Sequence, residues 1–134
     1  MIGDVDPDEQ VKKIRRFQPL ADYLPTKLEE FGIDDGGVVI AKNFEEMGKL
    51  LINGEVDIYF NSAYTAIEFQ KISGSEFLLR RSKDGVSSYW STYVVLKERM
   101  ADNFDEFLGQ VLAFEELRST SGYLLPAGQL LEKG

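Results

Sequence analysis

Short apolar runs alternate with helical patterns along this chain, and this alternation limits the folds open to it. Residues 38–41 are all apolar and include three β-branched residues, a pattern typical of a strand covered on both faces. Residues 56–60 form a second strand-like run, VDIYF. Strands that alternate with helices predict an α/β fold with a parallel sheet.

Apolar residues recur three or four positions apart over residues 8–31, which is the helical spacing. Because Pro19 and Pro25 interrupt this pattern, we expect one kinked helix or two abutting helices, closed by Gly32 in the left-handed conformation. Asn43 is expected to cap the next helix. Further helices are predicted over residues 44–52, 63–72 and 121–133, with Pro126 bending the first part of the last one.

The second half of the chain predicts three more strands. Residues 76–82 and 89–97 have strand-like patterns and are separated by the turn residues 83–85. Residues 111–114 form another short strand-like run. We therefore expect strands in both halves of the chain.

Composition excludes several classes of function. Asp and Glu number 23 against 15 Lys and Arg, which gives a net charge of -8, so nucleic acid is not expected as a partner. The chain has no Cys and no His, which removes disulfides, thiolate metal sites and the commonest general base. A hydrolase acting through Ser119 or Ser121 would lack the base that activates such a nucleophile. We therefore expect a protein that is not an enzyme and that uses no metal and no cofactor.

The sequence contains no long apolar stretch. No segment approaches the length of a transmembrane helix, and residues 1–20 lack the apolar core of a signal peptide. The same sequence would be seen if a leader had been removed, so composition alone leaves the localisation open.

The sharpest candidate site is the turn Ser119, Thr120, Ser121 and Gly122, which follows a predicted strand and precedes a predicted helix. Consecutive hydroxyls at a helix start combine with unsatisfied backbone N–H groups and the positive end of the helix dipole, which suits an oxyanion. Gly122 has no Cβ, so a ligand could approach the helix closely. The alternative is a plain helix N-cap beside a hydroxyl-rich loop.

Two further places offer small donors. Asn61, Ser62 and Tyr64 belong to a second strand-to-helix turn, for which the alternative is an Asn or Ser cap on a core-packed helix. Tyr89 opens a predicted strand after a glycine turn. Its phenol could donate into a cleft, or its ring could serve in cross-strand packing.

Several segments resemble the substrate-binding proteins of phosphate, phosphite and phosphonate ABC importers, which have the type II periplasmic binding protein fold. The similarity follows the chain in order, and its most specific motif is STSGYLLP at residues 119–126. The other matching segments are PLADYL at 19–24, GEVDI at 54–58, YWS at 89–91 and AFE at 113–115.

This resemblance implies a set of ligand contacts from two lobes. The hydroxyls at 119–121 would hold the oxygens of a phosphonate-like head group, Tyr89 would donate to it, and the turn 61–64 would face them from the other lobe. Phe44 stands where members commonly carry a Tyr, and Ala63 where a Pro is common. The implied ligand-binding residues are Asn61, Ser62, Tyr64, Tyr89, Ser119, Thr120, Ser121 and Gly122.

The family's members have two lobes and are much longer, so the resemblance implies a three-layer α/β sandwich that is incomplete relative to the family. Residues 1–90 would form a first-lobe segment, and residues 91–134 the crossing strand and the start of the second lobe. An incomplete sheet leaves open edges and apolar surface, so we expect a homodimer or a swapped assembly. Light scattering would detect it, and a clean monomer would contradict it.

The function implied by the resemblance is that of a periplasmic or extracytoplasmic solute-binding component of an ABC importer. It would capture phosphonate, phosphite or a similar small oxyanion and deliver it to an ABC permease. The alternative is a ligand-sensing or interaction module of the same fold without a role in transport. A neighbouring permease and ATPase would favour transport, whereas a following transmembrane helix with a kinase would favour sensing.

Overall fold

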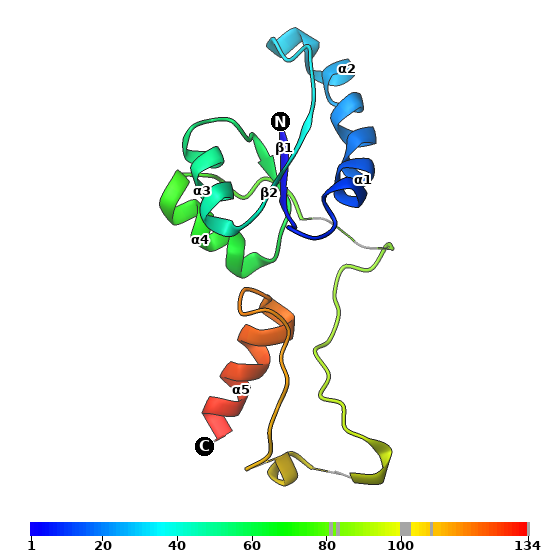
Figure 1. The fold of residues 1–134 in the computed structure, drawn as a ribbon, viewed down its shortest axis with the longest axis vertical. Helices are drawn as coiled ribbons and strands as arrows, with labels where there is room; N and C mark the ends of the chain where they lie inside the picture. The colour runs from blue at the N-terminus through cyan, green and yellow to red at the C-terminus, as the bar shows by residue number, and fades with distance from the viewer. Residues whose placement is uncertain (81, 83, 100–102, 108, 134) are drawn as a thin grey trace. The chain divides into compact units, whose positions relative to one another are not determined.

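A computed structural model describes residues 1–80, 82, 84–99, 103–107 and 109–133 of the chain. The chain divides into two compact units, unit 1 at Met1–Leu78 and unit 2 at Leu79–Gly134. Figure 1 shows the elements of each unit along the chain.

Unit 1 is built on a small parallel sheet of three strands. These are β1 (Ile2–Val5), β2 (Val38–Ala41) and β3 (Ile58–Tyr59), in the order β2-β1-β3. Ile2 of β1 pairs with Val38 on one side and with Ile58 on the other, both in parallel. The predicted α/β class with a parallel sheet is therefore confirmed, although β3 is shorter than the predicted run at 56–60.

The central strand, β1, was not predicted. Its sequence, IGDV, lacks a clear strand pattern because Gly3 and Asp4 have low strand propensity. Gly3 is required by packing, since a Cβ at this position would lie 2.8 Å from Val56 Cγ1 and 2.9 Å from Met47 Cε. Packing therefore requires a glycine at this position, and because glycine has low strand propensity, the sequence does not identify the segment as a strand.

The helices of unit 1 follow the predictions closely. Of the two expected alternatives, two abutting helices are present, α1 (Gln10–Tyr23) and α2 (Pro25–Leu28), continued by the 3-10 turn η1 (Glu29–Phe31). Pro25 begins α2 as expected, whereas Pro19 lies inside α1 and does not interrupt it. Gly32 ends this segment with a φ of 81°, as expected for a left-handed cap. Asn43 caps α3 by accepting from the Glu46 N–H at 2.9 Å. The other two predicted helices are α3 (Phe44–Ile52) and α4 (Ala63–Ser73).

Helices cover both faces of the sheet, with α1 on one side and α3 and α4 on the other (Figure 1). Phe17 and Ala21 of α1 pack with Ile2 in one buried cluster. On the opposite face a second buried cluster joins the sheet to the helices and consists of Ala41, Met47, Val56 and Phe69. Unit 1 is therefore a three-layer arrangement with a core on each side of its sheet.

One ion pair links the sheet to α1. The carboxylate of Asp4 is buried and accepts from Lys13 Nζ at 2.7 Å and from the Val5 N–H at 2.8 Å. The Lys13 ammonium also lies 3.8 Å from Asp6 Oδ2. Because a buried charge is costly unless it is paired, this contact explains how a charged residue is accommodated in the central strand.

Unit 2 contains helical turns and a terminal helix. The elements are the 3-10 turns η2 (Lys97–Arg99) and η3 (Phe104–Phe107), the π-helical turn η4 (Thr120–Leu124), and α5 (Leu125–Lys133). The helix predicted over 121–133 is therefore confirmed. It begins as a π turn and becomes α-helical at Leu125, with buried Pro126 in its first turn.

The strands predicted at 76–82, 89–97 and 111–114 are absent from the described residues, so these three predictions are wrong there; residue 81 lies outside the described part. Strands need a partner for their backbone groups and cover for their apolar side chains. Here the apolar side chains are uncovered: Leu79 is 96% exposed, Trp90 93% and Val111 98%. The expected association with a second chain stays a prediction.

None of the helices in the described ranges is long and apolar enough to cross a membrane.

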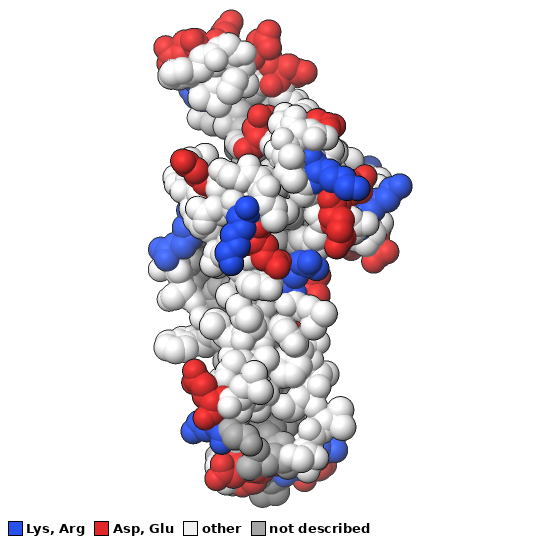
Figure 2. Space-filling model, turned by 90° about the vertical axis from the view of Figure 1, so that its left-hand side faces the viewer, with Lys and Arg blue, Asp and Glu red and all other residues white. Residues whose placement is uncertain are grey.

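The charge of unit 1 is unevenly distributed. Acidic side chains gather at the end that holds α2 and η1 (Figure 2), and Glu29 and Glu30 are both in η1. This end of unit 1 is therefore an unfavourable surface for an anion.

Candidate functional site

Ser119 forms the N-cap of the helical segment that makes up η4 and α5. Its Oγ accepts from the Gly122 N–H at 3.0 Å, and its carbonyl accepts from the N–H groups of Tyr123 at 3.1 Å and Leu124 at 3.0 Å. The backbone of Ser119 is extended, as is usual for an N-cap. The capping role that the sequence offered as the alternative is therefore present at Ser119, and its ligand binding stays a prediction.

Glu115 lies directly over this cap. The Ser119 hydroxyl donates to Glu115 Oε2 at 2.8 Å, and the Glu115 N–H donates to the Gly122 carbonyl at 3.2 Å. A Cβ on Gly122 would lie 2.1 Å from Glu115 Oε2 and 2.7 Å from Glu115 Cβ. In this structure the space beside Gly122, predicted to admit a ligand, is taken by the Glu115 side chain.

The segment that carries Tyr89 is attached to the start of the same helix. Ser91 Oγ donates to the Ser121 carbonyl at 2.7 Å, and the Tyr93 hydroxyl donates to the Pro126 carbonyl at 2.8 Å. Burial raises the pKa of the Tyr93 phenol above its ordinary value of 10.0, so the hydroxyl is a neutral donor at physiological pH. These two bonds bring residues far apart in the sequence into one site.

A pocket of about 440 Å³ lies between this segment and the helix start. We call it the neutral pocket. The structure thus brings together three of the predicted residues, Tyr89, Thr120 and Ser121, whereas Ser119 and Gly122 are not among its lining residues. Sequence reasoning did not propose the other lining residues as ligand contacts. The lining residues are Tyr89, Trp90, Ser91, Thr120, Ser121, Leu125, Pro126 and Gln129.

None of the described residues that line the neutral pocket is charged. The sequence signal that could have identified this site is a pair of uncharged stretches, residues 85–96 and 119–131, in a chain in which 28% of the residues are charged. A broad part of the visible surface of unit 2 also carries no charge (Figure 2). The pocket therefore offers hydroxyl, amide and backbone groups rather than counter-ions.

The second predicted turn follows β3 in unit 1. Ser62 Oγ accepts from the Thr65 N–H at 3.5 Å and so caps α4, while the Ser62 N–H donates to Asn61 Oδ1 at 2.6 Å. The Tyr64 hydroxyl donates to Glu68 Oε1 at 3.3 Å, one turn along the same helix. The capping alternative is therefore present here too, and ligand binding by Asn61, Ser62 and Tyr64 stays a prediction.

Phe44, for which the resemblance implied a Tyr in members of the family, packs against the core of unit 1. Its ring stacks on that of Phe69 with centroids 6.0 Å apart, and it lies against the cluster that includes Met47.

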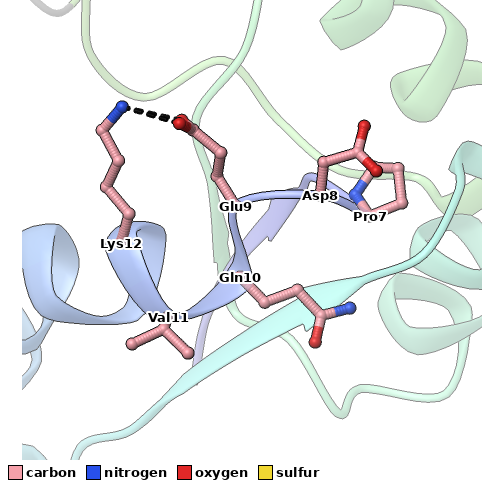
Figure 3. Close-up of a pocket in the computed structure, with 6 residues that line it drawn as sticks. All are labelled: Pro7, Asp8, Glu9, Gln10, Val11 and Lys12. Carbon is pink, nitrogen blue, oxygen red and sulfur yellow. Dashed lines mark hydrogen bonds and ion pairs between the residues drawn. The ribbon is translucent and has the colours of Figure 1, made fainter.

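A second hollow, at the start of α1 in unit 1, is less suited to an anion (Figure 3). Its lysine, Lys12, is paired with Glu9 at 2.8 Å. Asp8 is also in the lining, and Asp6 lies beside it, where a hydrogen bond from the Glu9 N–H lowers the pKa of the Asp6 carboxyl below its ordinary value of 3.8. These carboxylates would repel an oxyanion. The hollow is lined by Pro7, Asp8, Glu9, Gln10, Val11 and Lys12.

Comparison with known proteins identifies one family for this chain. The family described as ABC transporter, phosphonate, periplasmic substrate-binding protein matches residues 5–134. No solved structure matches the chain. Because the match covers nearly all of the sequence, including both stretches that form the neutral pocket, the chain belongs to the family of periplasmic substrate-binding proteins of phosphonate ABC transporters.

Proposed function

We propose that this protein captures a small tetrahedral oxyanion in the neutral pocket, with phosphonate as the preferred class and phosphite and phosphate as related ligands. The observation that carries the proposal is the meeting of Tyr89, Thr120 and Ser121 in one uncharged pocket at the start of a helical segment. The family is one of phosphonate-binding components of ABC transporters, which implies an ABC permease as the partner that receives the ligand.

Neutral donors suffice for this task. An oxyanion gives up its hydration on binding and needs hydrogen-bond donors in return, and hydroxyls beside a helix N-terminus supply them along with the positive end of the helix dipole. Thr120 and Ser121 are the first two residues of η4, so both their side chains and their backbone groups belong to that terminus. Tyr89 also lines the pocket, and its phenol is the third donor in this proposal.

The mechanism requires only binding and release. No proton needs to be transferred and no bond broken, so the residues need only orient donors and exclude water. Because the chain has a net charge of -8, attraction over long distances does not help an anion to arrive, and recognition depends on contacts made inside the pocket. A transported anion must also be released, and donors without formal charge favour reversible binding.

Isothermal titration calorimetry of the whole chain tests the proposal. We expect saturable one-site binding of methylphosphonate, with phosphite and phosphate bound by the same site in competition experiments. Sulfate is the matched control, because it is a tetrahedral dianion without a protonated oxygen near neutral pH. The absence of binding heat for methylphosphonate, phosphite and phosphate, supported by the same result in equilibrium dialysis, would contradict oxyanion capture by this chain.

A further inference from the structure

The Glu115 side chain places a negative charge at the start of the helical segment that the proposed function assigns to an oxyanion. Its Oε2 accepts from the Ser119 hydroxyl at 2.8 Å and lies against Gly122, where a Cβ would approach it to 2.1 Å. The main chain fixes this arrangement, since the Glu115 N–H donates to the Gly122 carbonyl at 3.2 Å. The Glu115 carboxylate therefore stands where the positive end of the helix dipole is strongest.

We propose that Glu115 is an affinity-determining residue, an internal anion that competes with the ligand for the start of the helix. This inference rests on the proposed function. An oxyanion in the neutral pocket would bind Thr120 and Ser121, whose backbone N–H groups share the helix terminus with the Ser119–Gly122 cap. The carboxylate partly neutralises that terminus, so the ligand meets a weaker dipole.

If Glu115 competes with the ligand, removing its charge should change the stability of unit 2 and its affinity for an anion in opposite directions. Glu115 stabilises the free protein, because an acidic side chain at a helix N-terminus is favourable. The same charge opposes a second anion nearby. Removing it should therefore lower the stability of unit 2 while raising its affinity for an anion. A residue with a purely structural role would lower both.

The test uses Glu115→Gln, which removes the charge and keeps the shape, and Glu115→Ala, which also clears the space beside Gly122. Glu116→Gln is the matched control, because it removes the same charge from the neighbouring residue. Methylphosphonate and inorganic phosphate are the probes, measured by calorimetry at low ionic strength. We expect both Glu115 variants to bind about three to ten times more tightly than the parent chain, with a lower melting temperature.

Salt gives a further readout. Glu115 is exposed, so its effect should be screened, and the difference between parent and variants should shrink at about 1 M NaCl. Unchanged or weaker binding by both Glu115 variants, or an equal gain in Glu116→Gln, would overturn the proposal while leaving the proposed function intact. Absence of binding by the parent and by every variant would instead overturn the proposed function, and this inference with it.

Discussion

Replacing Thr120 by Val is expected to weaken methylphosphonate binding by about 1 to 3 kcal/mol, or about five-fold to more than a hundred-fold in Kd. Val has nearly the shape of Thr but lacks the hydroxyl, so the substitution removes a donor from the neutral pocket without opening a cavity. A hydrogen bond to a charged group is stronger than one between neutral groups, and losing it leaves an oxygen of the ligand unsatisfied. Calorimetry on the two chains measures the difference directly.

Thr92→Val is the matched control for this experiment. Thr92 lies between Ser91 and Tyr93 on the same segment, is exposed, and is not among the lining residues of the neutral pocket. The control makes the same chemical change close to the site, so its Kd should stay within about two-fold of the parent value. Equal Kd values for Thr120→Val and the parent chain would place the ligand elsewhere.

Replacing Met47 by Ala is expected to lower the free energy of unfolding of unit 1 by about 2 to 5 kcal/mol. The Met47 side chain is fully buried, with 0% exposure, and packs with Ala41, Val56 and Phe69 between α3 and the sheet. Truncation removes buried apolar surface and leaves a cavity that the surrounding residues only partly fill. Urea denaturation followed by far-ultraviolet circular dichroism measures the loss.

Two controls accompany this substitution. Met47→Leu nearly conserves volume and should cost less than about 1.5 kcal/mol. Ile52→Ala truncates a residue of the same helix that is 58% exposed, so its cost should be well below that of Met47→Ala. A loss for Met47→Ala no larger than that for Ile52→Ala would mean that the second core cluster is not packed as described.

Unit 1 could be predicted from sequence largely because its signals are local. Pro25 marks the start of α2, Gly32 ends the segment through its left-handed backbone, and Asn43 marks the start of α3 through its side-chain cap. The strand β1 could not be predicted in this way. Gly3 is set by the approach of Val56 and Met47, and the charge of Asp4 is balanced by Lys13 from α1. Both causes lie outside the strand.

In unit 2 the local sequence pattern predicts strands that the described residues do not form. Residues 89–97 are rich in aromatic and β-branched side chains, which favour a strand when a neighbouring strand and a core are present. In the described residues this segment is instead attached to the helix start by the side chains of Ser91 and Tyr93. Strand propensity alone therefore did not determine its conformation.

The candidate site was predictable only in part. The hydroxyl run at 119–121 and the aromatic Tyr89 are visible in the sequence, and the structure places Tyr89, Thr120 and Ser121 around one pocket. The placement of Glu115 over Gly122 depends on the fold of the intervening loop. A carboxylate there could not be distinguished in sequence from the many acidic residues on solvated surfaces.

Amide NMR during a methylphosphonate titration tests whether the start of the last helical segment holds an oxyanion. We expect the amide signals of Thr120, Ser121 and Gly122 to shift together and to saturate at the concentration given by the calorimetric Kd. Saturating shifts confined to residues 7–12 at the start of α1, or no shift at residues 120–122 while binding heat is observed, would contradict it.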